Sequence, residues 1–345
     1  MTKLIGLDIG SKTIKVVELE RSGKINKLVT VGVSAAPPKG LLSELPLDHM
    51  ALAEAIKKTC LDARVTTRRV NIALPESMAF TRVIEMPMLS DKELASAIRW
   101  EAEQYIPLPL SEAILDYQIM GKDMSGKSGV NMQVFLVAVP KLLVVKYQAV
   151  VQAAQLEIVS IETEALALSR AILDADPTGP VTLVVSMGAQ RTNVFVAKGG
   201  NLILTHVIPT GGDALTRTFA SELGLDYQQA EEYKKTYGLK DEVLKSKVGE
   251  TVKLLLNNFL SELKRTISFY EEKNAHLGSI KRVVLVGGGA KLPNFVVYIA
   301  ENLGIEAQIG DPWQKVSETS KLRSQPFDPI IFSEAVGLAL KPETA

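Results

Sequence analysis

Two glycine turns, each set between two apolar strands, constrain the fold of this chain more than any other feature. The first lies in LIGLDIGSKTIKVVEL (Leu4–Leu19) and the second in TLVVSMGAQRTNVFVA (Thr182–Ala197). Apolar β-formers run up to Gly10 or Gly188 and resume after it, which predicts a β-hairpin in each segment. Either turn alone is typical of an ordinary β-turn, for which glycine supplies the geometry. Facing one another, two such turns would present bare backbone N–H groups to a polyphosphate.

A third glycine segment follows a strand near the C-terminus. It reads VVLVGGGAKLPN over residues 283–294, so four apolar β-formers run directly into three glycines. This pattern predicts a buried parallel strand that ends in a loop offering only backbone to a ligand. One glycine-rich turn is a weak signal, but three in this order are a much stronger one.

The order and wording of these segments resemble the actin, Hsp70 and sugar-kinase superfamily, and within it the PilM family of type IV pilus assembly proteins. The resemblance covers nearly the whole chain. It rests on DIGSKTIKVVEL, MPMLSDKELASAIRWEAEQYIPLPL (Met86–Leu110), LVAVPKLLV (Leu136–Val144), GGDALTRTFA and FSEAVGLAL. It implies an α/β, actin-like fold of two duplicated ribonuclease H-like domains around a nucleotide cleft, with an FtsA-type inserted βαββα subdomain.

Composition narrows the class of function. Lys and Arg number 39 against 39 acids, so no global charge favours nucleic acid or a membrane surface. The lone Cys60 excludes an intramolecular disulfide framework, and the three histidines lack ligand spacing. The longest apolar stretch, residues 134–151, is broken by Pro140 and two lysines, so no direct membrane insertion is expected. Without a signal-like start, we expect a cytoplasmic protein that reaches the inner membrane through a partner.

The order of the predicted elements divides the chain into five parts. They are a first actin-like domain (1–80), an inserted module (81–158), a connecting segment (159–180), a second actin-like domain (181–328) and a C-terminal helix returning to the first domain (329–345). Helices are expected at 50–63, 91–105, 142–155, 213–223 and 250–272. The two helices at 91–105 and 142–155 are expected on one face of the inserted sheet, and Ser90 with Glu93 predicts a capping box for the first of them.

By resemblance, the first hairpin holds the phosphates of ATP. Asp8 would hold Mg²⁺ through waters, Lys15 would neutralise phosphate charge, and the turn would donate to phosphate oxygens through Gly10, Ser11, Lys12 and Thr13. Outside the family context, Asp8 is equally typical of a turn cap and Lys15 of a solvated strand residue.

The remaining ATP contacts are also implied by resemblance. Phosphate and ribose positions are Gly188, Ala189, Thr192, Gly211 and Gly212; ribose and base positions are Glu231, Lys234, Gly288, Gly289 and Lys291. On spacing alone, Glu231 and Lys234 fit a surface ion pair equally well. Glu162 and Glu164 are candidates for positioning water, with a helix-start role as the alternative. Ser186 stands where the superfamily usually has a second aspartate, so we expect ATP binding with weak or no hydrolysis.

The family resemblance implies a scaffold rather than an enzyme. Its relatives bind the cytoplasmic N-terminal tail of the inner-membrane protein PilN in a groove between the first domain and the insert. Candidate groove residues are Trp100, Tyr105, Ile106 and Leu108, for which burial is the alternative account. Pilus motor ATPases and self-association are further candidate contacts. The rival functions are a true ATPase, a small-molecule kinase or an FtsA-like division protein.

Overall fold

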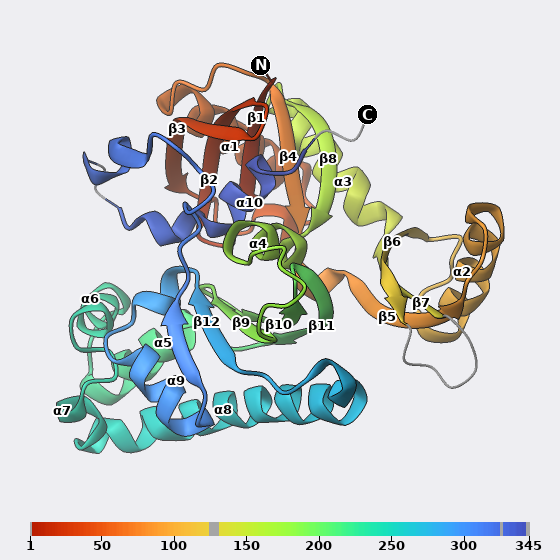
Figure 1. Ribbon diagram of the computed structural model, residues 1–345. Helices are drawn as coiled ribbons and strands as arrows, with labels where there is room; N and C mark the ends of the chain where they lie inside the picture. The colour runs from red at the N-terminus through yellow and green to blue at the C-terminus, as the bar shows by residue number, and fades with distance from the viewer. Residues whose placement is uncertain (1, 124–130, 325–326, 343–345) are drawn as a thin grey trace.

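Two lobes repeat one sheet topology, as the computed structural model shows for residues 2–123, 131–324 and 327–342 (Figure 1). Lobe 1 has the strand order β3-β2-β1-β4-β8 and lobe 2 the order β11-β10-β9-β12-β13. In each lobe the first three strands along the chain pair antiparallel and the last two join in parallel. The predicted duplicated actin-like fold is therefore confirmed.

The strands of lobe 1 are β1 (Thr2–Ile9), β2 (Thr13–Ser22), β3 (Ile25–Ala35), β4 (Arg69–Leu74) and β8 (Glu157–Thr163). Those of lobe 2 are β9 (Thr182–Met187), β10 (Thr192–Lys198), β11 (Asn201–Ile208), β12 (Arg282–Val286) and β13 (Glu306–Ile309). Both predicted glycine hairpins are thus present, as β1–β2 and β9–β10. Near-continuous apolar runs form them because both faces of each sheet are covered.

Helices cover the lobe 2 sheet and connect its strands. They are α5 (Gly212–Leu223), α6 (Tyr227–Tyr237), α7 (Asp241–Leu244), α8 (Lys247–Asn274) and α9 (Phe295–Leu303), with short 3-10 turns η3 (Ala275–Leu277) and η4 (Gly288–Lys291). Helix α8 buries an apolar stripe at helical spacing in the lobe 2 core, formed by Val252, Leu256, Phe259 and Leu263.

The inserted module is a three-stranded sheet with one helix. Its elements are β5 (Phe80–Pro87), α2 (Asp91–Tyr105), β6 (Ala113–Asp123) and β7 (Asn131–Pro140), in the strand order β5-β7-β6. The predicted bounds and capping box of α2 are confirmed. Its apolar side, Leu94, Ile98 and Ala102, is buried on the sheet. Strand β6 continues to Asp123, and residues 124–130 lie outside the described residues.

One helix expected in the insert belongs to lobe 1 instead. Helix α3 (Lys141–Ala153) buries Leu143, Val144 and Val150 in the core that contains α1 (Pro46–Asp62) and strands β1 and β4. The duplication explains this correction: α3 precedes β8 as α9 precedes β13, so both are crossover helices within their own sheet. Only the three strands and α2 project from the body in Figure 1.

The insert also contacts lobe 2. Phe135 of β7 is 1% exposed and lies in the same buried apolar cluster as Ala197 and Leu202 of lobe 2. Asn201 Nδ2 donates to the Met120 carbonyl (3.3 Å), and the hydroxyls of Thr81 and Thr205 are 2.5 Å apart. The insert therefore bridges both lobes at one edge of the molecule.

Two helices, α4 (Glu164–Ile172) and α10 (Ser333–Ala339), pack against each other between the sheets (Figure 1). A Cβ atom added to Gly337 would lie 1.8 Å from the Ala167 carbonyl oxygen, and one added to Gly6 of β1 would lie 1.8 Å from that of Ala335. Glycine is therefore required on both sides of α10. Arg170 adds to the joint by pairing with Glu162 (2.6 Å) and donating to the Gly337 carbonyl (2.8 Å).

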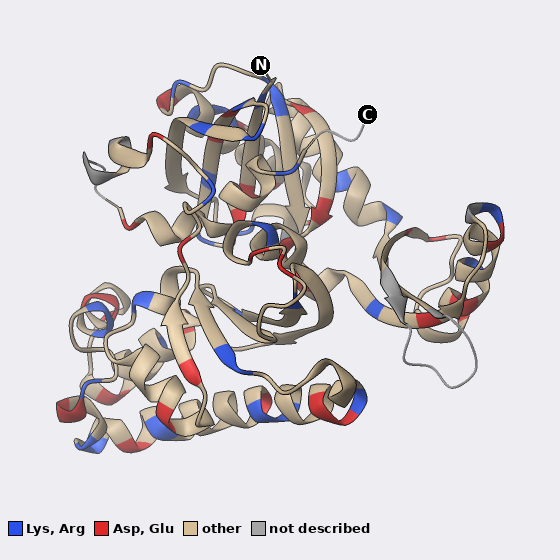
Figure 2. Cartoon of the chain, viewed as in Figure 1, with Lys and Arg blue, Asp and Glu red and all other residues tan. Residues whose placement is uncertain are grey.

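Charged residues of both signs are distributed along the whole fold in Figure 2, in keeping with the balanced composition. Helix α8 carries both signs along its length. Within the described ranges, no helix has the length and apolarity needed to cross a bilayer.

The contact between α4 and α10 sets up a stability test. We expect Gly337→Ala to lower the free energy of unfolding by about 3 kcal/mol or more, because the added methyl overlaps main chain that cannot swing away. Urea unfolding measures the loss. Gly288→Ala is the matched control, since a Cβ there meets no atom within 4 Å. Equal midpoints for the two variants would contradict the account of this joint.

Candidate functional site

The first hairpin turn places a carboxylate and an ammonium under its glycine. Asp8 ends β1 and is paired across the strands with Lys15, whose Nζ lies 2.7 Å from Asp8 Oδ2. A Cβ added to Gly10 would lie 3.6 Å from Asp8 Oδ1 and 3.7 Å from Lys15 Nζ. The bare face of Gly10 therefore looks onto this ion pair. The Lys15 side chain is 13% exposed, so it is not the solvated strand residue that its position alone allows.

The second hairpin repeats the first in backbone geometry. The Gly10 N–H donates to the Thr13 carbonyl (3.1 Å), and the Gly188 N–H donates to the Arg191 carbonyl (3.0 Å). The strand registers match Asp8 with Ser186 and Lys15 with Asn193. One turn geometry thus carries an ion pair in lobe 1 and a neutral Ser/Asn pair in lobe 2.

Side chains of each turn reach the opposite lobe. Lys12 Nζ of the first turn lies 2.6 Å from Asp213 Oδ1 on α5 of lobe 2. Arg191 of the second turn donates to the hydroxyl of Ser77, in the short helix η2 (Glu76–Met78) of lobe 1. The two turns therefore face each other, as the sequence predicted, and three cations gather around them: Lys12, Lys15 and Arg191. Arg191 was missed by the sequence reasoning because it shares no motif with the other two.

The N-terminus of α5 is tied to the second turn. The N–H groups of Gly212 and Asp213 donate to the carbonyls of Gly188 (2.9 Å) and Ala189 (2.8 Å). A Cβ on Gly211 would lie 2.6 Å from the Ala189 carbonyl oxygen, so glycine there permits close packing of the turn on α5. Thr192 Oγ1 donates to the Thr210 carbonyl just before this glycine pair (2.7 Å).

Glu231 and Lys234 of α6 turn inward onto α5. Lys234 Nζ donates to Glu231 Oε2 (2.7 Å), Thr216 Oγ1 (2.8 Å) and the Gly212 carbonyl (3.2 Å). The Lys234 side chain is 12% exposed, against 59% for the neighbouring Lys235. Burial raises the pKa of Glu231, but the Lys234 and Thr216 contacts outweigh it and lower the pKa overall. The pair is therefore part of the interior and not a surface ion pair.

The triple-glycine loop lies against the second hairpin. Gly287 has φ 78°, and a Cβ on Gly289 would lie 2.4 Å from the Met187 side chain. Packing against Met187 thus accounts for glycine at 289, where the sequence reasoning invoked a flat base. Gly288 is different, because a Cβ there meets open space. Lys291 forms an ion pair with Asp328 (3.2 Å), which precedes helix α10 in the chain.

Carboxylates from both lobe-joining helices lie beneath the hairpins. Glu164 starts α4 and accepts from Asn193 Nδ2 (2.5 Å) and the Glu76 N–H (3.0 Å). Desolvation, with Glu76 and Asp8 nearby, raises the pKa of Glu164 to about 7. Burial and the charges of Asp8 and Glu164 also raise the pKa of Glu334 on α10. Glu162, the other candidate for positioning water, instead pairs with Arg170 and Lys341 in the α4–α10 joint.

The four predicted groove residues do not form one surface. Ile106 is 6% exposed and Leu108 packs on the insert core, which fits the burial alternative. Tyr105 lies under the guanidinium of Arg82, 3.8 Å from the ring centroid. Trp100 is 75% exposed, so burial is the wrong account for this residue.

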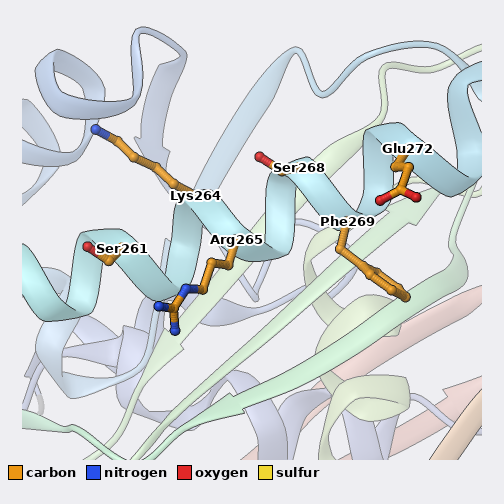
Figure 3. A pocket seen from close by; sticks show the side chains of 6 residues that line it. All are labelled: Ser261, Lys264, Arg265, Ser268, Phe269 and Glu272. Carbon is orange, nitrogen blue, oxygen red and sulfur yellow. The ribbon is translucent and has the colours of Figure 1, made fainter.

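A separate hollow runs along α8, away from both hairpins. Figure 3 shows its lining side chains on one side of the helix: Ser261, Lys264, Arg265, Ser268, Phe269 and Glu272. None of them belongs to the predicted site.

Facing hairpins on duplicated sheets define an actin-like protein, and solved structures support this class. MreB 5 of Spiroplasma citri bound to AMPPNP superposes with a TM-score of 0.54 at 14% identity, covering 98% of this chain and 95% of that one. The cell division protein FtsA of Streptococcus pneumoniae is 24% identical over 352 residues, which are 90% of this chain and 75% of that protein.

Within the actin-like class, the chain belongs to the family described as type IV pilus assembly protein PilM, whose profile matches residues 6–343. A solved PilM-PilN type IV pilus biogenesis complex contains a chain of TM-score 0.83 and 29% identity, covering 98% of this chain and 97% of that one. The family resemblance seen in the sequence is thereby confirmed.

Protonation of Glu164 makes the free energy of unfolding depend on pH. Its pKa of about 7 lies above its ordinary value of 4.5, so the folded state holds more protons than the unfolded chain between these values. Its stabilising contribution is complete below pH 4.5 and is lost as the pH rises through 7. We expect Glu164→Gln to flatten the fall in stability between pH 5 and 8, gaining about 1–2 kcal/mol relative to the wild type. Urea midpoints across this range measure it, and parallel curves for both proteins would refute it.

Proposed function

We propose that this chain is an ATP-binding scaffold of the type IV pilus machinery, in which nucleotide binding between the lobes sets the position of the insert. The observation that carries the proposal is the bridge made by the insert, which contacts lobe 2 through Phe135, the Thr81–Thr205 pair and the Asn201 bond. Lobe closure around a nucleotide would act directly on these contacts. Family membership supports the role in pilus assembly.

The residues around the hairpins fit a polyphosphate. The N–H groups of Gly10 and Gly188 close their own turns, and the cations Lys12, Lys15 and Arg191 would supply the positive charge that phosphate oxygens require. Gly212, Glu231 and Lys234 would contact the ribose and base edge, with the open face of Gly288 beside them. The MreB structure that shares this fold is bound to AMPPNP, which supports a nucleotide as the ligand.

Magnesium would be held mainly by water and phosphate oxygens. Asp8 supplies one carboxylate, already paired with Lys15, and no group of three acidic, His or Cys side chains within the described residues has the arrangement of a metal cage. Mg²⁺ suits such a site because it keeps several waters and binds through one or two carboxylates and substrate phosphates. When bound, it would offset phosphate charge.

Slow hydrolysis of ATP is the second candidate function. Ser186 brings no charge to the second hairpin. Its cross-strand partner Asn193, however, donates to Glu164, and the pKa of Glu164 is near neutrality. A steady-state phosphate-release assay tests this. Turnover that falls at least about tenfold in Glu164→Gln would favour an ATPase over a simple binding scaffold.

We also propose the cytoplasmic tail of PilN as a partner, since the structure of TM-score 0.83 is a PilM-PilN complex. The junction of lobe 1 and the insert exposes apolar side chains that suit a short peptide: Ile114 on β6 with Leu142 and Val145 on α3. Lys141 ties the two elements together, because its N–H donates to the Glu112 carbonyl (2.8 Å). Attachment to the membrane would follow from this partner.

The ATP site is tested by a pair of neighbouring lysines. Lys234→Ala removes the buried ammonium that bonds Gly212, so we expect ATP affinity to fall about tenfold or more. Lys235→Ala is the control, because its side chain is 59% exposed and its ammonium pairs with the exposed Glu232 (3.3 Å). Isothermal titration with ATP and Mg²⁺ measures both. Equal affinities in the two variants would place the nucleotide elsewhere.

Coupling to the partner is tested with a PilN tail peptide. We expect its affinity to differ by about threefold or more with and without ATP and Mg²⁺, since one ligand shifts the lobes only through its preference for one arrangement. The double substitution Thr205→Val and Asn201→Ala removes the polar contacts to the insert and should reduce that difference. If the wild type binds the PilN peptide with the same affinity in the presence and absence of ATP, nucleotide gating is contradicted.

A further inference from the structure

Lys12 is held across the gap between the lobes by a single acidic partner. Its ammonium lies 2.6 Å from Asp213 Oδ1, contacts the hydroxyl of Tyr227, and is 4.7 Å from the centroid of the Tyr227 ring. Lys12 is at the first turn of lobe 1, whereas Asp213 and Tyr227 begin α5 and α6 of lobe 2. This cluster therefore joins the lobes at the point where the turns face each other.

Asp213 is the fixed member of the cluster. Its N–H donates to the Ala189 carbonyl (2.8 Å), its carboxylate accepts from Tyr227 (2.9 Å), and the residue is 8% exposed. Its negative charge consequently stands beside the second turn, on the same backbone that would support a phosphate. A carboxylate held there presents an oxygen anion to Lys12 much as a phosphate would.

Lys12 has more freedom than Lys15 to change partners. Its side chain is 42% exposed, against 13% for Lys15, which is paired with Asp8 on its own sheet. Burial lowers the pKa of Lys12, but the bonds to Asp213 and Tyr227 outweigh it and raise the pKa. The ammonium is therefore charged at neutral pH and strongly drawn to whichever anion is near.

Resting on the proposed ATP site, we infer that Asp213 is an internal competitor for the nucleotide phosphates, and that ATP binds by taking Lys12 away from it. One ammonium cannot give its best geometry to both anions, so nucleotide affinity is reduced by the strength of the Lys12–Asp213 pair. The exchange also frees α5 and α6 of lobe 2 from the first turn of lobe 1. Only a ligand whose phosphates attract the Lys12 ammonium more strongly than Asp213 does would then separate this contact between the lobes.

A double-mutant cycle separates competition from simple repulsion between Asp213 and phosphate. ATP affinity, with Mg²⁺ present, is titrated for the full chain, Asp213→Asn, Lys12→Met and the double variant. Competition predicts that Asp213→Asn raises affinity about threefold to tenfold, that Lys12→Met lowers it about tenfold, and that Asp213→Asn has less than about a twofold effect once Lys12 is gone.

The other outcomes overturn the inference. An equal gain from Asp213→Asn in both backgrounds means repulsion alone, and a loss means that Asp213 positions Lys12 for phosphate. Glu318→Gln is the matched control, because it breaks the Lys27–Glu318 pair (3.0 Å) at the end of β2 and β3 opposite the first turn and should leave ATP affinity unchanged. A wild type that binds no ATP refutes the proposed function itself, whereas binding without the predicted coupling refutes only the competition.

Discussion

The close main-chain contact of α10 with α4 and β1 is the constraint on which the rest of the structure depends. At Gly337 and Gly6 the backbones approach until no side chain fits, which fixes where the two sheets stand relative to each other. The Glu162–Arg170 pair and the Arg170 bond to Gly337 strengthen the same joint. Because both hairpins project from sheets anchored here, the spacing of the two glycine turns is inherited from this packing.

Duplication supplies equivalent positions, and the chain uses them unequally. Gly10 and Gly188 keep the same turn geometry, but the ion pair of Asp8 and Lys15 is matched in lobe 2 by Ser186 and Asn193. At these two equivalent positions lobe 1 therefore carries an ion pair and lobe 2 neutral side chains, whereas Arg191 brings a cation to the second turn itself. This asymmetry favours phosphate binding over hydrolysis, because lobe 2 lacks a carboxylate at the position of Ser186.

Much of the fold and part of the candidate site were predictable from the sequence. Runs of apolar β-formers on both sides of Gly10 and Gly188 predicted both hairpins, and a capping box predicted the start of α2, because these are local signals. The placement of α3 was not predictable, since its apolar side would fit either the insert or lobe 1 and only the sheet order decides. Arg191 and Glu334 lie inside segments that the sequence analysis quoted, but their roles depend on contacts with residues far away in the chain, such as Ser77 for Arg191 and Asp8 for Glu334. Gly289 also packs against the Met187 side chain, a local role that the glycine motif alone does not reveal.

The attachment of the insert at two points gives it the geometry of a lever. Its short arm ends at the contacts of Phe135, Thr81 and Met120 with lobe 2, and its long arm carries α2, with the exposed Trp100, out from the body (Figure 1). A rotation of lobe 2 must either break the short-arm contacts or swing the long arm through a wider arc. A small rotation where the insert meets the two lobes would therefore become a larger displacement of α2, whose exposed Trp100 is accessible to another molecule.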